Sequence, residues 1–208
     1  MLKGIENIIL DLGGVIINLN QELTTKAFQQ LFPINHNEIL EKSQTQQLFE
    51  KYEINQVSTA EFLQFFKTFN PFINENQIIE AWNKMLLEIP LERIDLIEKL
   101  SKMYNVFLLS NTNELHYQTI EKQYQQTSEK GTFESLFKKA YLSYRIGLRK
   151  PSQEIFEYLL HDAHLKPENT LFIDDSLEHI NAASTLGIRT YHLDPNNNEI
   201  LTTLFNEY

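Results

Sequence analysis

The sequence has no cysteine, few basic residues and no long hydrophobic run, and each of these absences excludes a class of function. Without cysteine, a disulfide framework, a thiolate metal site and a cysteine nucleophile are impossible, so any nucleophile must be an oxygen or a nitrogen. The 18 lysines and arginines stand against 28 aspartates and glutamates, a net charge of -10 that repels nucleic acid and anionic membranes. No segment has the length of a membrane span, and acids interrupt the apolar start of the chain too early for a signal peptide. We therefore expect a cytoplasmic protein with no nucleic-acid or membrane partner.

Length and composition predict a folded protein with one functional site. The chain has 208 residues, 42% of them hydrophobic and 22% charged, which is enough for one core domain with a smaller insertion. This composition is ordinary for a globular protein and does not indicate extensive disorder. The sequence carries no indication of an oligomeric state.

Short apolar, β-branched runs separated by helical patterns predict a parallel sheet. The first run, residues 5–11, ends at Asp11 and is followed by a turn at Gly13 and Gly14. The later part of the chain predicts strands at 106–110, 140–143, 170–174 and 188–192, helices at 91–103 and 177–186, Pro151 as the first residue of another helix, and a polar turn at 196–198. Alternating strands and helices are typical of a Rossmann-like, doubly wound α/β fold with helices on both faces of the sheet.

Residues 21–92 interrupt this alternation with the apolar spacing of helices. The pattern indicates about four helices, with breaks at Pro33, Asn55 and Asn70, and Asn55 suits a left-handed turn. The helical block falls after the first strand. We therefore predict an α/β core domain at residues 1–18 and 91–208 and a helical cap domain at residues 19–90.

The cap is rich in phenylalanine, and its aromatic stripes are most simply explained as its own hydrophobic core. Some cap residues must nevertheless face the rim of the core domain, since a cap that closes over a site excludes water and contacts the leaving group. The loop at residues 18–21 and the turn at residues 53–57 are the predicted contacts.

Ligands of open parallel sheets bind at the carboxyl ends of the strands. At those ends the sequence places Asp11, Ser110, Asn111, Asp174 and Asp175, while Lys150 stands just before a predicted helix. Each has an ordinary explanation when taken alone, as a turn residue, a helix cap or a solvated side chain. Adjacent acids at the end of a buried strand, however, repel each other unless a cation meets them. Together the groups suit a phosphoryl substrate: a carboxylate attacks phosphorus, a divalent cation and a lysine neutralise its oxygens, and hydroxyl donors hold the rest.

Four segments of the sequence resemble the motifs of the haloacid dehalogenase-like (HAD) hydrolase superfamily. They are Asp11-Leu-Gly-Gly-Val, Leu108-Leu-Ser-Asn-Thr-Asn, Gly147-Leu-Arg-Lys-Pro and Phe172-Ile-Asp-Asp-Ser. The helical block resembles the cap that follows the first motif in that superfamily. Its segment Glu53-Ile-Asn-Gln-Val-Ser-Thr-Ala-Glu-Phe and the run from Ser110 to His116 are similar to the alpha-glucose-1-phosphate phosphatase-like and epoxide-hydrolase N-domain branch.

This resemblance implies a phosphatase that acts on a small phosphorylated metabolite such as a sugar phosphate, with Mg²⁺ as cofactor. Asp11 would attack phosphorus and form an aspartyl-phosphate that water hydrolyses. Ser110 and Asn111 would bind the phosphoryl oxygens, and Lys150 would offset the charge of nucleophile and phosphate. Magnesium prefers oxygen ligands, which the resemblance assigns to the Asp11 carboxylate, the Gly13 main-chain carbonyl and Asp175, with Asp174 as a further ligand or a holder of water. The sequence leaves open which of the two adjacent acids contacts the metal.

One position departs from the pattern of most phosphatases of the superfamily. Gly13 stands where they carry a second aspartate, which protonates the leaving oxygen and contributes roughly a hundredfold to ten-thousandfold in rate. Three explanations remain open: a phosphatase restricted to good leaving groups, such as anomeric phosphates; proton transfer by another residue, His116 or Glu53; or a catalytically weak protein that binds a phosphate compound or a partner as a regulator. His116 is also interpretable as a surface histidine on the helix after the second strand. A dehalogenase is disfavoured, since the dehalogenases of the superfamily carry a bulky residue at this position and use no magnesium.

Overall fold

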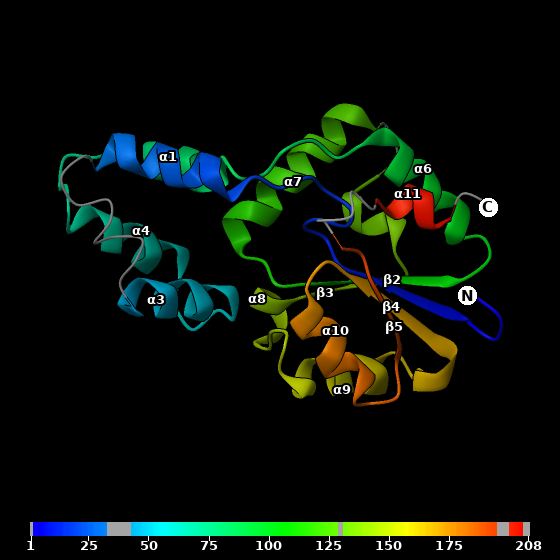
Figure 1. Cartoon of the computed structure of the whole chain (residues 1–208). Coiled ribbons are helices and arrows are strands. Elements are labelled where there is room, and N and C mark those ends of the chain that lie inside the picture. Colours follow the sequence, from blue (N-terminus) through cyan, green and yellow to red (C-terminus); the bar gives the residue numbers. More distant parts are fainter. Residues whose placement is uncertain (1, 33–42, 129–130, 195–199, 206–208) are drawn as a thin grey trace.

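A computed structural model describes residues 2–32, 43–128, 131–194 and 200–205. Its centre is a parallel five-stranded sheet in the order β3-β2-β1-β4-β5 (Figure 1). The strands are β1 (Asn7–Leu10), β2 (Asn105–Ser110), β3 (Lys139–Leu142), β4 (Thr170–Asp174) and β5 (Arg189–His192). The predicted α/β fold with a parallel sheet is confirmed.

The register of the three central strands determines where the site lies. Leu10, the last residue of β1, pairs with Leu108 of β2 and with Ile173 of β4. The N–H group of Asp11 continues this ladder by donating to the carbonyl of Ile173 at 3.0 Å. The residues that follow β1, β2 and β4 therefore meet at one edge of the sheet.

Helices cover both faces of the sheet (Figure 1). On one face lie α6 (Leu91–Leu100), α7 (Glu114–Thr127) and α11 (Leu201–Leu204), and on the other lie α9 (Gln153–Asp162) and α10 (Leu177–Ser184). Successive residues of β1 point to opposite faces, so Ile8 and Leu10 pack with the first group of helices and Ile9 with the second. Short elements complete the core: α8 (Ser143–Ile146) and the 3-10 helices η1 (Phe133–Leu136) and η2 (Pro167–Asn169).

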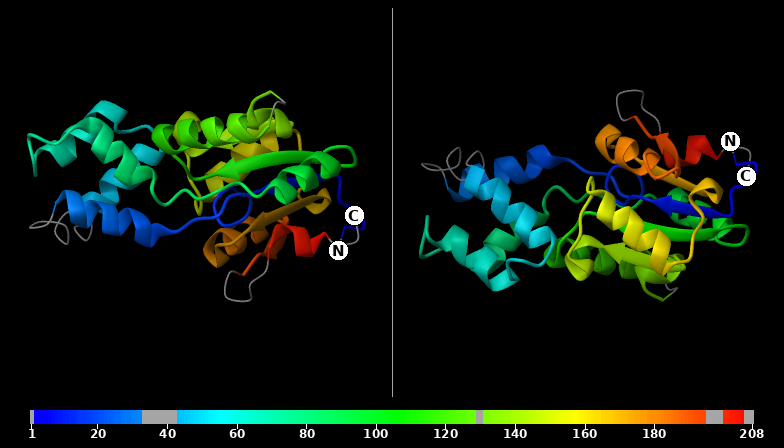
Figure 2. Two further views of the ribbon diagram at one scale, coloured as in Figure 1. Left: turned by 90° about the horizontal axis from the view of Figure 1, so that it is seen from above. Right: turned by 90° about the horizontal axis from the view of Figure 1, so that it is seen from below.

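The other helices in the described part of the chain form a separate layer at the end of the molecule away from α11 and the beginning of β1 (Figure 2). They are α1 (Gln21–Leu31), α3 (Ser43–Glu53), α4 (Thr59–Lys67) and α5 (Glu75–Asn83). They enclose a core of their own, in which Phe28, Phe62 and Phe66 are fully buried and Trp82 is nearly so. The aromatic stripes therefore serve mainly to hold this helical layer together.

Two neighbouring segments connect the helical layer to the sheet. They run antiparallel: the N–H of Leu87 donates to the carbonyl of Asn18 at 3.0 Å, and the N–H of Asn20 donates to the carbonyl of Met85 at 2.9 Å. A side-chain hydrogen bond of 2.7 Å from Asn18 to Glu88 reinforces the pair. The two segments that connect the helical layer to the sheet thus form a short hydrogen-bonded ladder.

The structure agrees with some local predictions and differs from others. Pro151 does not begin a helix, since α9 starts at Gln153 behind the N-cap residue Ser152. The Lys150–Pro151 peptide is cis. Asn55 has a φ of 58° and confirms the expected left-handed turn. The predicted break at Pro33 and the polar turn at 196–198 lie outside the described residues. Within the described part of the chain, no helix is both long and apolar enough to cross a membrane.

Candidate active site

Asp11 lies at the start of a tight loop that leaves β1. The N–H groups of Ile16 and Ile17 both donate to the carbonyl of Leu12, at 2.8 and 2.9 Å, which folds the loop back on itself. Gly14 has a φ of 75°, and a Cβ atom there would overlap the carboxylate of Asp175. Glycine at this position therefore lets the loop approach the end of β4 and brings Asp175 close to the Asp11 loop.

Lys150 is the central cation of the site, with only 1% of its side chain exposed. Its Nζ donates to Oδ1 of Asp11 at 2.6 Å, to Oδ2 of Asp174 at 2.6 Å and to the carbonyl of Leu109 at 3.0 Å. One ammonium group thus bridges the acids at the ends of β1 and β4. Such charge-assisted hydrogen bonds fix both carboxylates in place.

Asn111 holds the main chain of Lys150. The Asn111 Oδ1 atom accepts a hydrogen bond from the Lys150 N–H, and its Nδ2 donates to the Lys150 carbonyl, both at 2.8 Å. The sequence predicts direct contact of Asn111 with phosphoryl oxygens. In the structure, both polar atoms of its side-chain amide instead bind the main chain of Lys150 and position that residue. Ser110, at the end of β2, makes only a long hydrogen bond of 3.4 Å to the carbonyl of Asn111, so its hydroxyl can turn toward a ligand.

The acids carry more negative charge than Lys150 neutralises. Burial raises the pKa of Asp11 to about 7, while Lys150 acts against the rise. Burial and the charge of Asp174 also raise the pKa of Asp175. For Asp174, burial acts in the same direction, but Lys150 and His179 outweigh it and hold the pKa at about 2. Three carboxylates beside one ammonium group therefore favour an additional cation.

The donor set of this cluster fits magnesium. One carboxylate oxygen from each of Asp11, Asp174 and Asp175 lies within 4.8 Å of the others. Oxygen ligands with a surplus of negative charge are what Mg²⁺ prefers. The main-chain carbonyl of Gly13 lies in the loop that carries Asp11, and its oxygen is a further candidate ligand for Mg²⁺.

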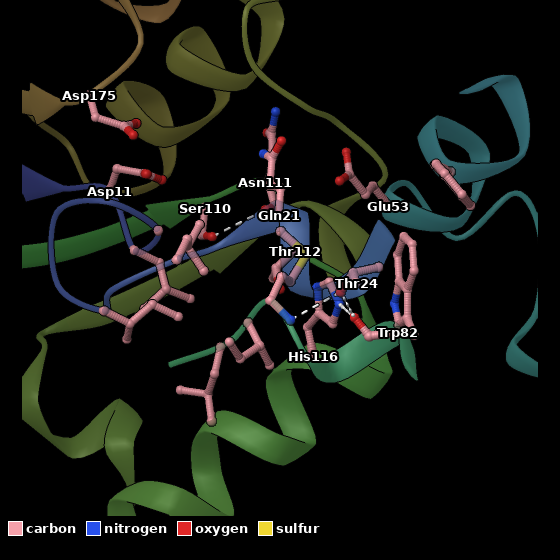
Figure 3. Close-up of a pocket in the computed structure, with 18 of the residues that line it drawn as sticks. Asp11, Gln21, Thr24, Glu53, Trp82, Ser110, Asn111, Thr112, His116 and Asp175 are labelled. Atoms are coloured by element: carbon pink, nitrogen blue, oxygen red, sulfur yellow. Dashed lines mark hydrogen bonds between the residues drawn. The ribbon is translucent and has the colours of Figure 1, made fainter. Parts of the chain in front are cut away.

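The two adjacent acids differ in their surroundings. Asp174 has no exposed side-chain surface, and its oxygens accept hydrogen bonds from Lys150 (2.6 Å), from Nδ1 of His179 (2.9 Å) and from the N–H of Ser176 (2.8 Å). Asp175 is half-buried and lines the cavity above the sheet edge (Figure 3). This contrast makes Asp175 the better candidate for direct contact with a metal. Sequence reasoning missed His179, whose only signal was a histidine one helical turn beyond the acid pair.

A cavity of about 500 Å³ lies between the sheet edge and the helical layer. Its wall includes the predicted site residues Asp11, Gly13, Ser110, Asn111, Lys150 and Asp175. Sequence reasoning did not identify the contributions of Thr24, Phe49, Met85 and Leu86, whose place in the wall depends on how the helical layer packs. The predicted contact segments contribute Leu19, Gln21 and Glu53.

His116 is not a surface histidine, so that interpretation was wrong. It is 8% exposed because the indole of Trp82 stacks on its ring, with centroids 4.8 Å apart. The Nε2 atom lies 3.2 Å from the carbonyl of Trp82, and Nδ1 lies 3.1 Å from the amide nitrogen of Asn113. A neutral ring protonated at Nε2 satisfies both contacts, and burial lowers the pKa of His116 to about 4. The histidine is therefore neutral at pH 7 and has no free nitrogen for proton transfer.

The side chain of Leu19 packs directly against Gly13. A Cβ atom at Gly13 would lie 2.5 Å from Cδ1 of Leu19, a residue of the first connecting segment. The apolar side chain of Leu19 therefore fills the space that a larger residue at position 13 would need. A larger residue at position 13 would therefore require the end of the Leu19 side chain to move.

The chain matches known proteins over most of its length. The model of the haloacid dehalogenase-like hydrolase family matches residues 5–187. The chain is 32% identical over 188 residues to the D-ribitol-5-phosphate phosphatase of Bacteroides thetaiotaomicron, covering 90% of this chain and 91% of that protein.

Solved structures agree with this match. The HAD family enzyme bt-2542 of B. thetaiotaomicron superposes with a TM-score of 0.90 at 35% identity, covering 97% of this chain and 98% of that one. An aspartate-to-alanine mutant of that enzyme was solved with magnesium and inorganic phosphate; it superposes with a TM-score of 0.87 at 34% identity, covering 97% and 99% of the two chains. A predicted HAD-like hydrolase from Porphyromonas gingivalis superposes with a TM-score of 0.81 at 34% identity, covering 91% of each chain.

Proposed function

The chain belongs to the haloacid dehalogenase-like hydrolase family, and from that membership we propose that it is a magnesium-dependent phosphatase with Asp11 as nucleophile. The observation that carries the proposal is the buried Lys150, which joins Asp11 and Asp174 at the rim of the cavity. The relative that is named a D-ribitol-5-phosphate phosphatase, and the solved complex of bt-2542 with magnesium and inorganic phosphate, support the same activity. The substrate is a small phosphate ester of a sugar or a sugar alcohol.

In the proposed reaction an Asp11 carboxylate oxygen attacks phosphorus. The bond from phosphorus to the leaving oxygen breaks as the new bond forms, and the leaving oxygen takes its proton from water. Water then attacks the aspartyl-phosphate at phosphorus, which releases inorganic phosphate and restores the Asp11 carboxylate. Lys150 offsets the charge of the phosphoryl oxygens, and the hydroxyl of Ser110 donates a hydrogen bond to one of them.

The residues that would hold magnesium are Asp11 and Asp175 through their carboxylates and Gly13 through its carbonyl. When bound, Mg²⁺ supplies positive charge that stabilises the phosphoryl oxygens in the transition state. Asp174 would not contact the metal; it holds Lys150 and His179 in position through hydrogen bonds.

The two adjacent acids are therefore expected to affect magnesium binding unequally. Asp175→Asn removes a carboxylate that points into the cavity, so we expect magnesium affinity to fall at least about a hundredfold. Asp174→Asn acts through Lys150 and His179 and is expected to cost roughly tenfold, the lower end of effects for residues behind the ligands. Calorimetric titration of both variants with Mg²⁺ measures the two losses, and thermal unfolding checks that each variant is folded. A larger loss in Asp174→Asn would reverse the assignment.

Gly13 limits the kinds of leaving group that the proposed phosphatase can release quickly. Without an acid at position 13, and with Leu19 in its space, a substrate whose leaving oxygen needs little protonation should react fastest, which favours anomeric phosphates. Ribitol 5-phosphate, the substrate in the relative's name, is instead an ester of a primary alcohol. Both classes therefore belong in a substrate panel.

Phosphate release from such a panel tests the proposed function. We expect turnover of p-nitrophenyl phosphate and of sugar or alditol phosphates that requires Mg²⁺ and stops when EDTA is added. Equal efficiency on anomeric and primary-alcohol phosphates would contradict the dependence on leaving group. If purified, magnesium-loaded protein turned over none of these esters, the alternative of a catalytically weak phosphate-binding regulator would be supported instead.

We further propose that residues 19–90 act as a cap over the cavity, with residues 1–18 and 91–208 as the core domain. The separate aromatic core of the helical layer, and the short ladder formed by the two segments that join it to the sheet, support this division. The cap supplies part of the cavity wall, so it contacts the part of the substrate that leaves and not the phosphoryl group.

A further inference from the structure

The cavity has two ends of different character (Figure 3). Asp11 and Asp175 lie at one side with Ser110 next to them, and Glu53 lies at the other side, beyond Asn111. With a phosphoryl group at the first end, the second end is left for the rest of the substrate. The side chain at the far end therefore faces the carbon chain of the substrate.

Glu53 is fixed at this far end by Arg149. The Nε atom of Arg149 donates to Oε2 of Glu53 at 3.1 Å, and the Glu53 side chain is 24% exposed. Arg149 directly precedes Lys150, so this ion pair ties the end of α3 to the segment that carries the central cation. A carboxylate has about four acceptor positions, and the bond to Arg149 uses one of them. The remaining positions can accept hydrogen bonds from substrate hydroxyl groups.

Among the described residues that line the cavity, no cation is available to bind a second anionic group of a substrate near Glu53. Arg149 also contacts Glu50, with its Nη1 atom 3.3 Å from Oε1, so two carboxylates share one guanidinium group. Lys150 is held by Asp11 and Asp174. In that described wall, the other basic side chains are His116, which is neutral, and His179, which contacts Asp174. An anion at this end would face surplus negative charge.

We propose that Glu53 accepts hydrogen bonds from the hydroxyl groups of the leaving alcohol and repels leaving groups that carry a second negative charge. The enzyme then selects monophosphates of neutral polyols over bisphosphates and phosphorylated acids. This inference rests on the proposed phosphatase function and adds the residue that determines which leaving group is accepted. Building repulsion against the wrong substrate is a common source of specificity.

Two substrates that differ only at the far end test the inference. Ribitol 5-phosphate ends in a hydroxymethyl group and ribonate 5-phosphate in a carboxylate. For the wild type we expect kcat/KM to favour ribitol 5-phosphate at least about tenfold. Glu53→Gln keeps a hydrogen-bonding side chain but removes the charge, so this ratio should fall about tenfold, chiefly through a lower KM for ribonate 5-phosphate. Glu53→Ala, which removes both, should also raise KM for ribitol 5-phosphate.

Glu50→Gln is the matched control. It makes the same change of charge on the same helix and beside the same Arg149, but Glu50 does not line the cavity. Its selectivity ratio should stay within about twofold of the wild type, since exposed charges are well screened. Equal effects of Glu50→Gln and Glu53→Gln would overturn the assignment to Glu53, and so would a Glu53→Gln ratio equal to that of the wild type.

Turnover of p-nitrophenyl phosphate separates failure of this inference from failure of the proposed function. If the wild type hydrolyses the aryl ester with Mg²⁺ but does not discriminate between the two five-carbon substrates, only the role of Glu53 is wrong. If the wild type hydrolyses no ester, the phosphatase proposal fails and this inference fails with it. Thermal unfolding of each variant shows whether a change in selectivity comes from a folded protein.

Discussion

Replacing Asp11 by asparagine is expected to lower kcat by at least about ten-thousandfold, the scale seen when a catalytic nucleophile is removed. The amide has nearly the same shape and its oxygen can still accept the hydrogen bond from Lys150. It lacks the negative charge and the nucleophilic oxygen needed to attack phosphorus. Steady-state hydrolysis of p-nitrophenyl phosphate and of ribitol 5-phosphate with Mg²⁺ measures the loss.

The same variant should still fold and bind phosphate. Asparagine removes a buried negative charge that already has a raised pKa, so thermal stability should not decrease by more than a few degrees. At saturating Mg²⁺, inorganic phosphate should bind with affinity equal to or higher than in the wild type, because repulsion between two anions is reduced. A variant that keeps more than about a tenth of the wild-type kcat would exclude Asp11 as the nucleophile.

Replacing Lys150 by methionine is expected to have the largest effect on stability. The substitution removes three hydrogen bonds and leaves the buried carboxylates of Asp11 and Asp174 without their cation. Breaking a buried ion pair from one side costs about 3–5 kcal/mol. Activity should fall as well, because the charge on the phosphoryl oxygens would no longer be offset by the ammonium group. Urea unfolding without Mg²⁺ measures the free energy of unfolding.

The pH dependence of this loss follows from Asp174. Against the effect of burial, Lys150 and His179 lower its folded-state pKa to about 2, below the ordinary 3.8. A lowered folded-state pKa stabilises the wild type above the ordinary value, and that stability is lost as pH falls toward 2. Without Lys150, burial dominates at Asp174, so acid stabilises the variant by protonating this carboxylate. Asp11, whose pKa is already raised in the wild type, becomes protonated in both proteins. The difference between wild type and variant should therefore shrink from pH 7 to pH 4.

Lys139→Met provides a matched control for this substitution. Lys139 also pairs with an aspartate, Asp162, at 2.6 Å, but its side chain is 50% exposed. Exposed ion pairs contribute about 1 kcal/mol or less, so this variant should unfold close to the wild type at both pH values. If Lys139→Met and Lys150→Met lost equal stability, or if the loss in Lys150→Met did not depend on pH, the buried cluster would not have the role given to it.

The position of the site could be predicted from sequence because parallel strands end at one edge. Asp11, Ser110 and Asp174 lie at the ends of three neighbouring strands, and the register of those strands brings them together. Strand patterns of apolar residues are local signals, so this step needs no knowledge of side-chain packing. The same holds for the glycine loop after Asp11.

The remaining contacts depend on packing between distant segments. His116 looks exposed from its helix alone, and only the docking of Trp82 from α5 buries it. Glu53 and Arg149 are 96 positions apart and meet because the helical layer packs against the core. The amide of Asn111 has the groups to bind a phosphate, yet its partner is the main chain of Lys150. These contacts cannot be predicted from the periodicity or the motifs of the sequence.

Phosphorylation of Asp11 itself tests the central claim most directly. Because position 13 supplies no base for the attacking water, the aspartyl-phosphate should break down slowly and accumulate during turnover. Acid quenching of the reaction with p-nitrophenyl phosphate and Mg²⁺, followed by digestion and mass spectrometry, identifies the labelled residue. We predict one phosphoryl group on Asp11, which is absent when Mg²⁺ is removed and absent from Asp11→Asn. Turnover without a phosphorylated peptide, or with the phosphoryl group on another residue, would contradict the account.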